Sequence, residues 1–260
     1  MTNYRSLLLL LIGAVVMVAA VFVALRFAGD TSDTDEPPAT AMSRADVEKI
    51  VRNYLLENPE VIIEAVNGMQ RKEDAERIAK MREGAKSHAT ALFKEAEPLV
   101  AGNPKGDVTI IEFFDYRCPY CKQVTADLAT LLKQDGNIRL VLKEFPILSA
   151  ESGMAAKAAI ASTAQGKYWD FHMALMNAEE LSEELIFKLA KDTGIDVARL
   201  KKDMADPKIN KRLAETDDLA KKLGVNSTPT FFVGDEPMAG AQSLNELKDA
   251  VAKARKAQPS

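Results

Sequence analysis

Residues 108–115 read VTIIEFFD, and Cys118-Pro119-Tyr120-Cys121 follows after two further residues. The β-branched and aromatic residues of this stretch predict a buried strand. From about residue 122 to 133, apolar residues recur at helical spacing, which predicts a helix directly after the cysteines. The segment 138–142 (IRLVL) predicts the next strand. The cysteine pair is therefore expected where a strand gives way to a helix.

The rest of the chain completes an α/β pattern. Residues 151–223 are expected to form a helical insert, with breaks at Gly166, Gly194 and Asp206-Pro207. Residues 230–233 (TFFV) predict a strand, 238–242 its hairpin partner, and 243–256 a closing helix capped by Ser243. This order predicts a mixed sheet flanked by helices.

The cysteine pair has more value as a reactive site than as a cross-link. Cys118 and Cys121 are the only cysteines, and a bond between them closes too small a loop to stabilise the fold much. A helix start favours the thiolate of Cys118, and Pro119 fits the first turn. We therefore expect an accessible Cys118 as nucleophile and Cys121, one turn on, as the thiol that resolves the mixed disulfide.

The acidity of Cys118 can be bounded. A helix terminus contributes up to about 2 kcal/mol, or about 1.5 pKa units, which lowers a thiol from ~8.5 to about 7. The sequence thus predicts a thiolate of intermediate acidity.

Metal and nucleic-acid functions fit the sequence poorly. A zinc half-site would need about two more ligands, and His88 and His172 lie in separate helical stretches. A net charge of -4, with both signs interleaved, disfavours a nucleic-acid surface. We expect no metal, no other cofactor and no nucleic-acid partner.

The N-terminus predicts export. An uncharged apolar run from Leu7 to Leu25 lies between Arg5 and Arg26, and as a helix it would be about 28 Å long, close to the bilayer core of roughly 30 Å. We expect residues 1–29 to be an uncleaved inner-membrane anchor; a signal peptide cleaved after residues 18–20 (VAA) is the alternative. Either way the rest of the protein would lie on the periplasmic side, where disulfides persist.

A linker and a helical region are expected next. Residues 30–42 are acidic and contain proline, which indicates a linker. In the region 43–100, Ser43 and Asp46 resemble a capping box and Asn58-Pro59 separates two helices. Their apolar stripes are Val47, Ile50, Val51, Tyr54 and Leu55, then Val61, Ile62, Ala65, Val66 and Met69. We expect these stripes to meet copies of themselves in a homo-oligomer; packing against the main domain, residues 101–257, is the alternative.

The chain from about residue 104 to 256 resembles the DsbA family of exported thioredoxin-like proteins. The matching motifs are Phe113-Phe114-Asp115 before the cysteine pair, Lys143-Glu144-Phe145-Pro146, and the segment 227–233 (STPTFFV). The helical segment 43–86 is similar to the N-terminal extension of the ScsC-like branch, whose members include oligomeric disulfide isomerases. The resemblance implies a thioredoxin fold with a helical insertion.

The resemblance also implies roles for individual residues. Pro229 would follow a cis peptide bond beside the cysteines, with the backbone of Thr228 pairing with substrate; an ordinary trans proline is the alternative. Glu112 would be a buried acid beneath Cys121 that takes its proton; a structural pair with Lys143 is the alternative. Tyr120 would shape the rim of the site, and Trp169 and His172 are expected to pack within the insert.

These observations favour a disulfide isomerase or reductase for exported cysteine-containing proteins, kept reduced by a DsbD-like membrane donor. A DsbA-type dithiol oxidase, re-oxidised by a DsbB-like acceptor, is the first alternative. A copper-binding or chaperone module is the second.

Overall fold

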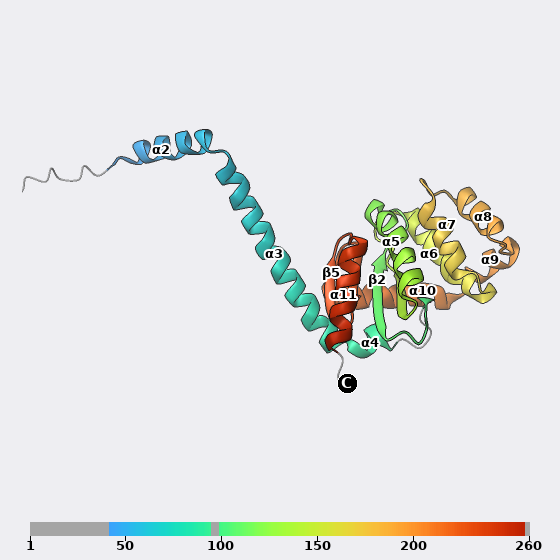
Figure 1. Ribbon diagram of the computed structural model, residues 1–260. Coiled ribbons are helices and arrows are strands. Elements are labelled where there is room, and N and C mark those ends of the chain that lie inside the picture. The colour runs from blue at the N-terminus through green and yellow to red at the C-terminus, as the bar shows by residue number, and fades with distance from the viewer. Residues whose placement is uncertain (1–41, 95–98, 258–260) are drawn as a thin grey trace, which may run out of the picture. The chain divides into compact units, whose positions relative to one another are not determined.

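A five-stranded mixed sheet organises the computed structural model, which describes residues 42–94 and 99–257. Its strands lie in the order β1-β3-β2-β4-β5, of which Figure 1 labels β2 and β5. The strands are β1 Leu99–Gly102, β2 Val108–Phe114, β3 Ile138–Glu144, β4 Thr230–Val233 and β5 Glu236–Ala239. β2 runs parallel to β3, whereas the other neighbouring strands pair antiparallel. The expected mixed sheet is confirmed.

Alternate residues of the central strands serve two separate cores. Ile110 and Phe114 of β2 pack in a cluster with α5 (Pro119–Asp135) and α11 (Leu244–Ala257). Ile111 and Phe113 pack in a second cluster with α10 (Pro207–Leu223), the end of α3 (Glu60–Ser87) and α4 (Ala89–Phe93). The period of two in a strand explains why neighbouring residues of one apolar run stabilise opposite faces of the sheet.

The helical insert follows the predicted breaks with one addition. Its elements before α10 are α6 Ala150–Ser162, η1 Thr163–Gln165, α7 Tyr168–Asn177, α8 Glu183–Asp192 and α9 Val197–Asp203. Gly166 and Gly194 have φ of 67° and 79°, the left-handed region that glycine adopts without steric cost. The break between α7 and α8 was not predicted, and Ser182 caps the start of α8 there.

Two predicted boundaries need correction. The hairpin partner β5 occupies Glu236–Ala239 rather than 238–242, because Gly234 and Asp235 alone form the turn. The predicted domain boundary between residues 100 and 101 falls inside β1, a strand that was not predicted from the sequence. Met81, Ala85 and Leu92 also lie in the second core, so this core draws on residues well before 101.

The two N-terminal helices form as predicted. Ser43 caps the start of α2 (Arg44–Glu57), and its hydroxyl oxygen accepts the backbone N–H of Asp46 at 3.2 Å. The chain divides into two compact units after Glu64, so α2 lies in the first unit and most of α3 in the second. Val47, Ile50, Val51 and Tyr54 of α2 are each about half exposed.

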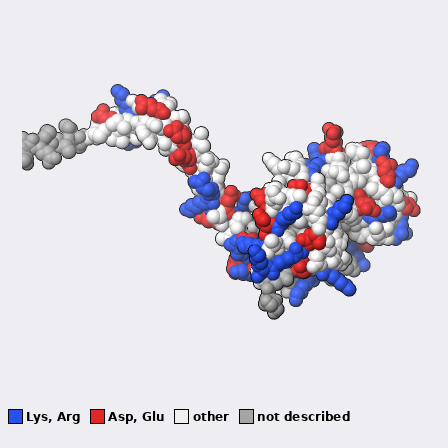
Figure 2. Space-filling model, in the orientation of Figure 1, with Lys and Arg blue, Asp and Glu red and all other residues white. Residues whose placement is uncertain are grey.

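Within the described residues, side chains of both charges lie at the surface, and no helix is suited to cross a membrane. Basic and acidic side chains are interspersed on the face that Figure 2 shows. None of the helices within residues 42–94 and 99–257 combines the length and apolar character that a bilayer span requires. The predicted anchor, residues 1–29, and nearly all of the linker 30–42 lie outside the described residues.

Candidate active site

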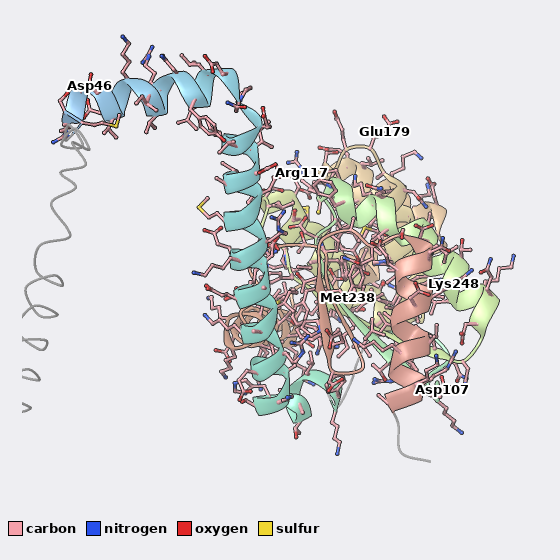
Figure 3. The ribbon with its side chains drawn as sticks, turned by 60° about the vertical axis from the view of Figure 1, so that its left-hand side comes forward. Asp46, Asp107, Arg117, Glu179, Met238 and Lys248 are labelled. Carbon is pink, nitrogen blue, oxygen red and sulfur yellow. The ribbon has the colours of Figure 1, made fainter. Side chains whose placement is uncertain are left out.

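Cys118 stands at the start of α5, as predicted. It is the N-cap residue, Pro119 occupies the first turn, and both cysteines are free thiols. The neighbouring Arg117 is labelled in Figure 3. The sulfur of Cys118 lies 3.2 Å from the carbonyl oxygen of Thr228. Only 3% of Cys118 is exposed, less than the sequence led us to expect, because Thr228 lies against its sulfur.

Hydrogen bonds favour the thiolate form of Cys118. The Cys121 thiol, the Thr228 hydroxyl and the backbone N–H groups of Tyr120 and Cys121 lower the pKa of Cys118 to about 6, against the opposing effect of burial. The Cys121 thiol makes the largest of these contributions and the N–H groups of the helix start the smallest, which explains why the pKa lies below the value of about 7 expected from the helix start alone.

Cys121 has the opposite character. It is fully buried, and burial, the Cys118 sulfur and the charge of Glu112 raise the pKa of its thiol well above the usual value. At neutral pH Cys121 is therefore a protonated thiol held next to a thiolate. It can attack only after its proton has been removed.

Glu112 lies buried in β2 close enough to both sulfurs to interact with them electrostatically. Burial, and secondarily the charge of Cys118, raise the pKa of its carboxyl group to about 8. Its Oε1 has no hydrogen-bond partner among the described residues. A carboxyl group with this pKa changes its charge near neutral pH, which suits exchange of a proton with a neighbouring thiol.

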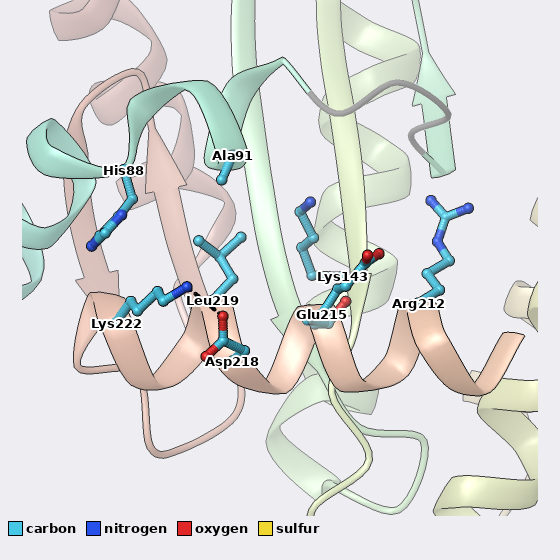
Figure 4. Close-up of a pocket in the computed structure, with 9 residues that line it drawn as sticks. His88, Ala91, Lys143, Arg212, Glu215, Asp218, Leu219 and Lys222 are labelled. Atoms are coloured by element: carbon cyan, nitrogen blue, oxygen red, sulfur yellow. Dashed lines mark ion pairs between the residues drawn. The ribbon is translucent and has the colours of Figure 1, made fainter. Parts of the chain in front are cut away.

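The alternative prediction, in which Glu112 forms a structural pair with Lys143, is wrong. The register pairs Glu112 with Leu142 and Phe113 with Lys143, so the side chains of Glu112 and Lys143 point to opposite faces of the sheet. Lys143 lines a cavity of about 310 Å³ with Arg212 and Glu215 of α10 (Figure 4).

The structure also places the other residues that the sequence singled out. The Thr228–Pro229 peptide bond is cis. Tyr120 is 61% exposed, which fits a residue at the rim of the site. His172 is buried in α7 and stacks on Trp169 of the insert with ring centroids 5.4 Å apart, and its ring also meets Phe114 of β2 edge-on at 4.9 Å.

A buried polar cluster behind the site was not predicted from the sequence. Oε1 of Glu144 accepts the hydroxyl groups of Tyr116 and Tyr168, each at 2.9 Å, and the Tyr116 hydroxyl lies 3.2 Å from Nδ1 of His172. Burial raises the pKa of Glu144 to about 8. The only sign of this cluster in the sequence was that Glu144 belongs to the motif at residues 143–146 (KEFP). The spacing of residues along the chain does not show that two tyrosines bind the same carboxyl group.

The geometry suits thiol–disulfide exchange. A stabilised thiolate, a buried resolving thiol and a cis-proline loop converge at the end of β2. Across residues 42–94 and 99–257, His, Cys, Asp and Glu side chains form no group of three or more able to hold a metal ion.

Comparison with known proteins places this site in a family. Residues 109–252 match the DSBA-like thioredoxin domain, and residues 44–76 match the N-terminal domain of the copper resistance protein ScsC. The chain is 32% identical over 155 residues to the Na(+)/H(+) antiporter NhaA 3 of Salinispora tropica, a match that covers 58% of this chain and 24% of the antiporter. The chain thus spans about a quarter of this curated relative's length.

Two solved structures extend the comparison. A thioredoxin-like oxidoreductase from Silicibacter pomeroyi is 44% identical with a TM-score of 0.63, covering 65% of this chain and 98% of that one. Proteus mirabilis ScsC in a transitional conformation is 26% identical with a TM-score of 0.62, covering 82% and 97%. The chain therefore belongs to the DSBA-like thioredoxin domain family and carries an ScsC-type N-terminal domain.

Proposed function

We propose that this protein is a disulfide isomerase or reductase for exported cysteine-containing proteins on the periplasmic side of a bacterial inner membrane. The contrast between the two thiols supports the proposal most directly. Cys118 has a pKa of about 6, whereas the pKa of Cys121 lies far above the neutral range. Cys118 is thus the nucleophile and Cys121 the resolving thiol.

The isomerase cycle needs no net oxidation. The Cys118 thiolate attacks one sulfur of a mispaired substrate disulfide, that S–S bond breaks, and the other substrate sulfur leaves as a thiolate. The freed thiolate attacks a different substrate disulfide, and a final substrate thiolate displaces Cys118. The substrate backbone would pair with Thr228 beside Pro229 during these steps.

Cys121 releases the protein from a Cys118–substrate mixed disulfide that fails to rearrange. Once deprotonated, with Glu112 as the proton acceptor, it attacks the Cys118 sulfur and releases the reduced substrate. The protein then holds a Cys118–Cys121 disulfide, and a DsbD-like membrane donor must supply two electrons to restore the dithiol.

The apolar face of α2 favours isomerase over oxidase. Val47, Ile50 and Tyr54 are 45%, 54% and 54% exposed and lie on one side of the helix, an arrangement that suits self-association. The ScsC-type match covers the same helix. Two or more joined copies would present several Cys118 thiols to one misfolded substrate.

Scrambled, fully oxidised ribonuclease tests the activity. The reduced protein should restore ribonuclease activity, and Cys118→Ser should abolish the effect. Cys121→Ser should accumulate a mixed disulfide with the substrate, visible on a non-reducing gel. Failure to reactivate scrambled ribonuclease, with rapid oxidation of reduced ribonuclease by the disulfide form, would show an oxidase instead.

The dithiol oxidase remains the second candidate because of the acidity of Cys118. A thiol with a pKa of about 6 is a good leaving group, which makes the disulfide form more oxidising. A DsbB-like acceptor would then re-oxidise the pair.

Self-association has its own test. Ile50→Asp with Tyr54→Asp should reduce the mass measured by light scattering to that of a monomer. Asn53→Asp, on the polar side of α2, is the matched control and should leave the mass unchanged. A monomeric unmodified protein would remove the support for isomerase over oxidase.

A further inference from the structure

Asp115 is a buried carboxylate, 1% exposed, directly between β2 and the turn that precedes Cys118. Its Oδ1 accepts the backbone N–H of Arg117 at 2.7 Å and the hydroxyl group of Ser152 at 2.6 Å. Its Oδ2 accepts the backbone N–H groups of Ile147 and Leu148, each at 2.9 Å. One side chain thus joins the cysteine turn, the start of α6 and the loop that follows β3.

The backbone of Asp115 also touches both cysteines. Its carbonyl oxygen accepts the N–H of Cys118 at 3.0 Å. Its own N–H donates toward the sulfur of Cys121 and partly offsets the raised pKa of that thiol. A shift of Asp115 would therefore move both sulfurs.

The four side-chain hydrogen bonds require a carboxylate. A buried charge is costly unless its lone pairs are used, and a carboxylate offers about four acceptor positions, which matches the four donors here. Asparagine has the same shape, but its NH₂ group would face donors, either the pair at Oδ1 or the pair at Oδ2. Position 115 therefore requires a side chain that is negatively charged and offers about four acceptor positions.

The loop held by Oδ2 displays apolar side chains. Ile147 is 41% and Leu148 is 52% exposed, although their backbone N–H groups are fixed by the buried carboxylate. The N–H of Phe145 still donates to the carbonyl of Phe114 at 3.0 Å, so the loop leaves the sheet beside the segment that leads to Cys118. The apolar pair is therefore fixed at the same end of the sheet as the reactive sulfur.

We propose that Asp115 is a positioning residue: its carboxylate fixes the Cys118 turn against the apolar loop of Ile147 and Leu148. This arrangement favours substrates with apolar side chains next to their reacting disulfide. The apolar loop contacts the part of the substrate whose sulfur has reached Cys118, because Asp115 holds this loop next to the thiol. The inference rests on the proposed function, since it concerns the substrates of that thiol.

The test uses the reduced full chain and two peptides, each joined to glutathione by a disulfide. The peptides differ only in the residues beside cysteine, which are Leu in one and Ser in the other. The wild-type protein should react about tenfold faster with the Leu peptide, a ratio equivalent to about 1.4 kcal/mol and near the lower end for burial of one Leu side chain.

Variants separate positioning from a general structural role. Asp115→Asn should reduce the Leu/Ser ratio to about two or below, as should Ile147→Ser combined with Leu148→Ser. The triple variant should show no further decrease, because the changes act through one surface. Ser152→Ala removes a single bond to Oδ1 and should keep the ratio. An Asp115→Asn protein that is less stable yet keeps the ratio would overturn the proposal.

The remaining outcomes are also decisive. Should Asp115→Asn fail to fold, the exposed Ile147→Ser and Leu148→Ser changes decide alone, and an unchanged ratio contradicts the inference. Wild-type protein that reacts normally with glutathione disulfide but shows no preference overturns only this inference. Wild-type protein that reacts with no disulfide at all would overturn the proposed function instead.

Discussion

At Cys118 the hydrogen bond from the Cys121 thiol, supported by the Thr228 hydroxyl and by N–H groups of the helix start, lowers the pKa to about 6. The Cys121 thiol that gives this hydrogen bond is buried and has a raised pKa. The two effects are linked, because the donor must keep its proton in order to stabilise the neighbouring thiolate. The first sulfur is therefore ready to react while the second is held back.

Thr228→Val should raise the pKa of Cys118, because it removes the hydroxyl group and retains the backbone carbonyl. The expected rise is about one pKa unit, the equivalent of one hydrogen bond of roughly 1.4 kcal/mol. Absorbance of the thiolate at increasing pH measures it, with Thr230→Val, at the first residue of β4, as the control. An unchanged titration would show that the hydroxyl group has no part in thiolate stabilisation.

Glu112→Gln should change how stability depends on pH. The carboxyl pKa is about 8 in the fold and 4.5 as the ordinary value, so the folded state binds its proton more tightly. The free energy of unfolding therefore decreases as pH rises from 4.5 to 8, by about 3 kcal/mol at pH 7 for this group. The Gln variant should lack this decrease in urea unfolding of the reduced protein at pH 4 and 7. Parallel pH dependences in both proteins would contradict the assignment.

At the scale of elements, the end of α3 packs closely on the end of α10. A Cβ atom added at Gly84 would lie 2.9 Å from Cα of Leu223 and 3.0 Å from the carbonyl oxygen of Lys222. Backbone atoms cannot move aside as a flexible side chain can. The small residue therefore permits the contact that keeps Met81 and Ala85 in the second core.

Gly84→Ala should lower the free energy of unfolding by about 1–3 kcal/mol, despite the better helix propensity of alanine. Gly68→Ala is the matched control in the same helix, because its added Cβ would meet only the end of the Arg71 side chain at 3.8 Å. It should stabilise the protein by up to about 1 kcal/mol. Equal effects of the two changes in urea unfolding would argue against the close contact.

Local signals predicted most elements, and long-range contacts account for the errors. Ser43, Asn58-Pro59 and the glycines act through the backbone of their immediate neighbours, so their positions fixed helix ends. The strand β1 has only four residues, too short a run to predict a strand, and it forms by pairing with β3, which its own sequence does not show. Lys143 was misassigned for a similar reason, since strand register decides which face a side chain occupies.

For the whole molecule, the sequence predicted the cysteine turn and several of its neighbours but not the buried contacts of Asp115. The cysteine spacing, Thr228-Pro229 and Glu112 could be placed because each lies in a short motif near a strand or helix end. The contacts of Asp115 with residues 147, 148 and 152 join parts more than 30 positions apart. A charged residue directly after an apolar strand was the signal for a buried hub, although it could not name the donors.

The pH dependence of alkylation of the reduced protein tests the central claim most directly. Iodoacetamide should label one thiol, Cys118, at a rate that follows a pKa of about 6, and Cys121 should stay unlabelled at neutral pH. Peptide mass mapping identifies the labelled residue. Labelling of Cys121 first, or a rate that rises only near the ordinary thiol pKa of about 8.5, would contradict the assignment of Cys118 as the nucleophile.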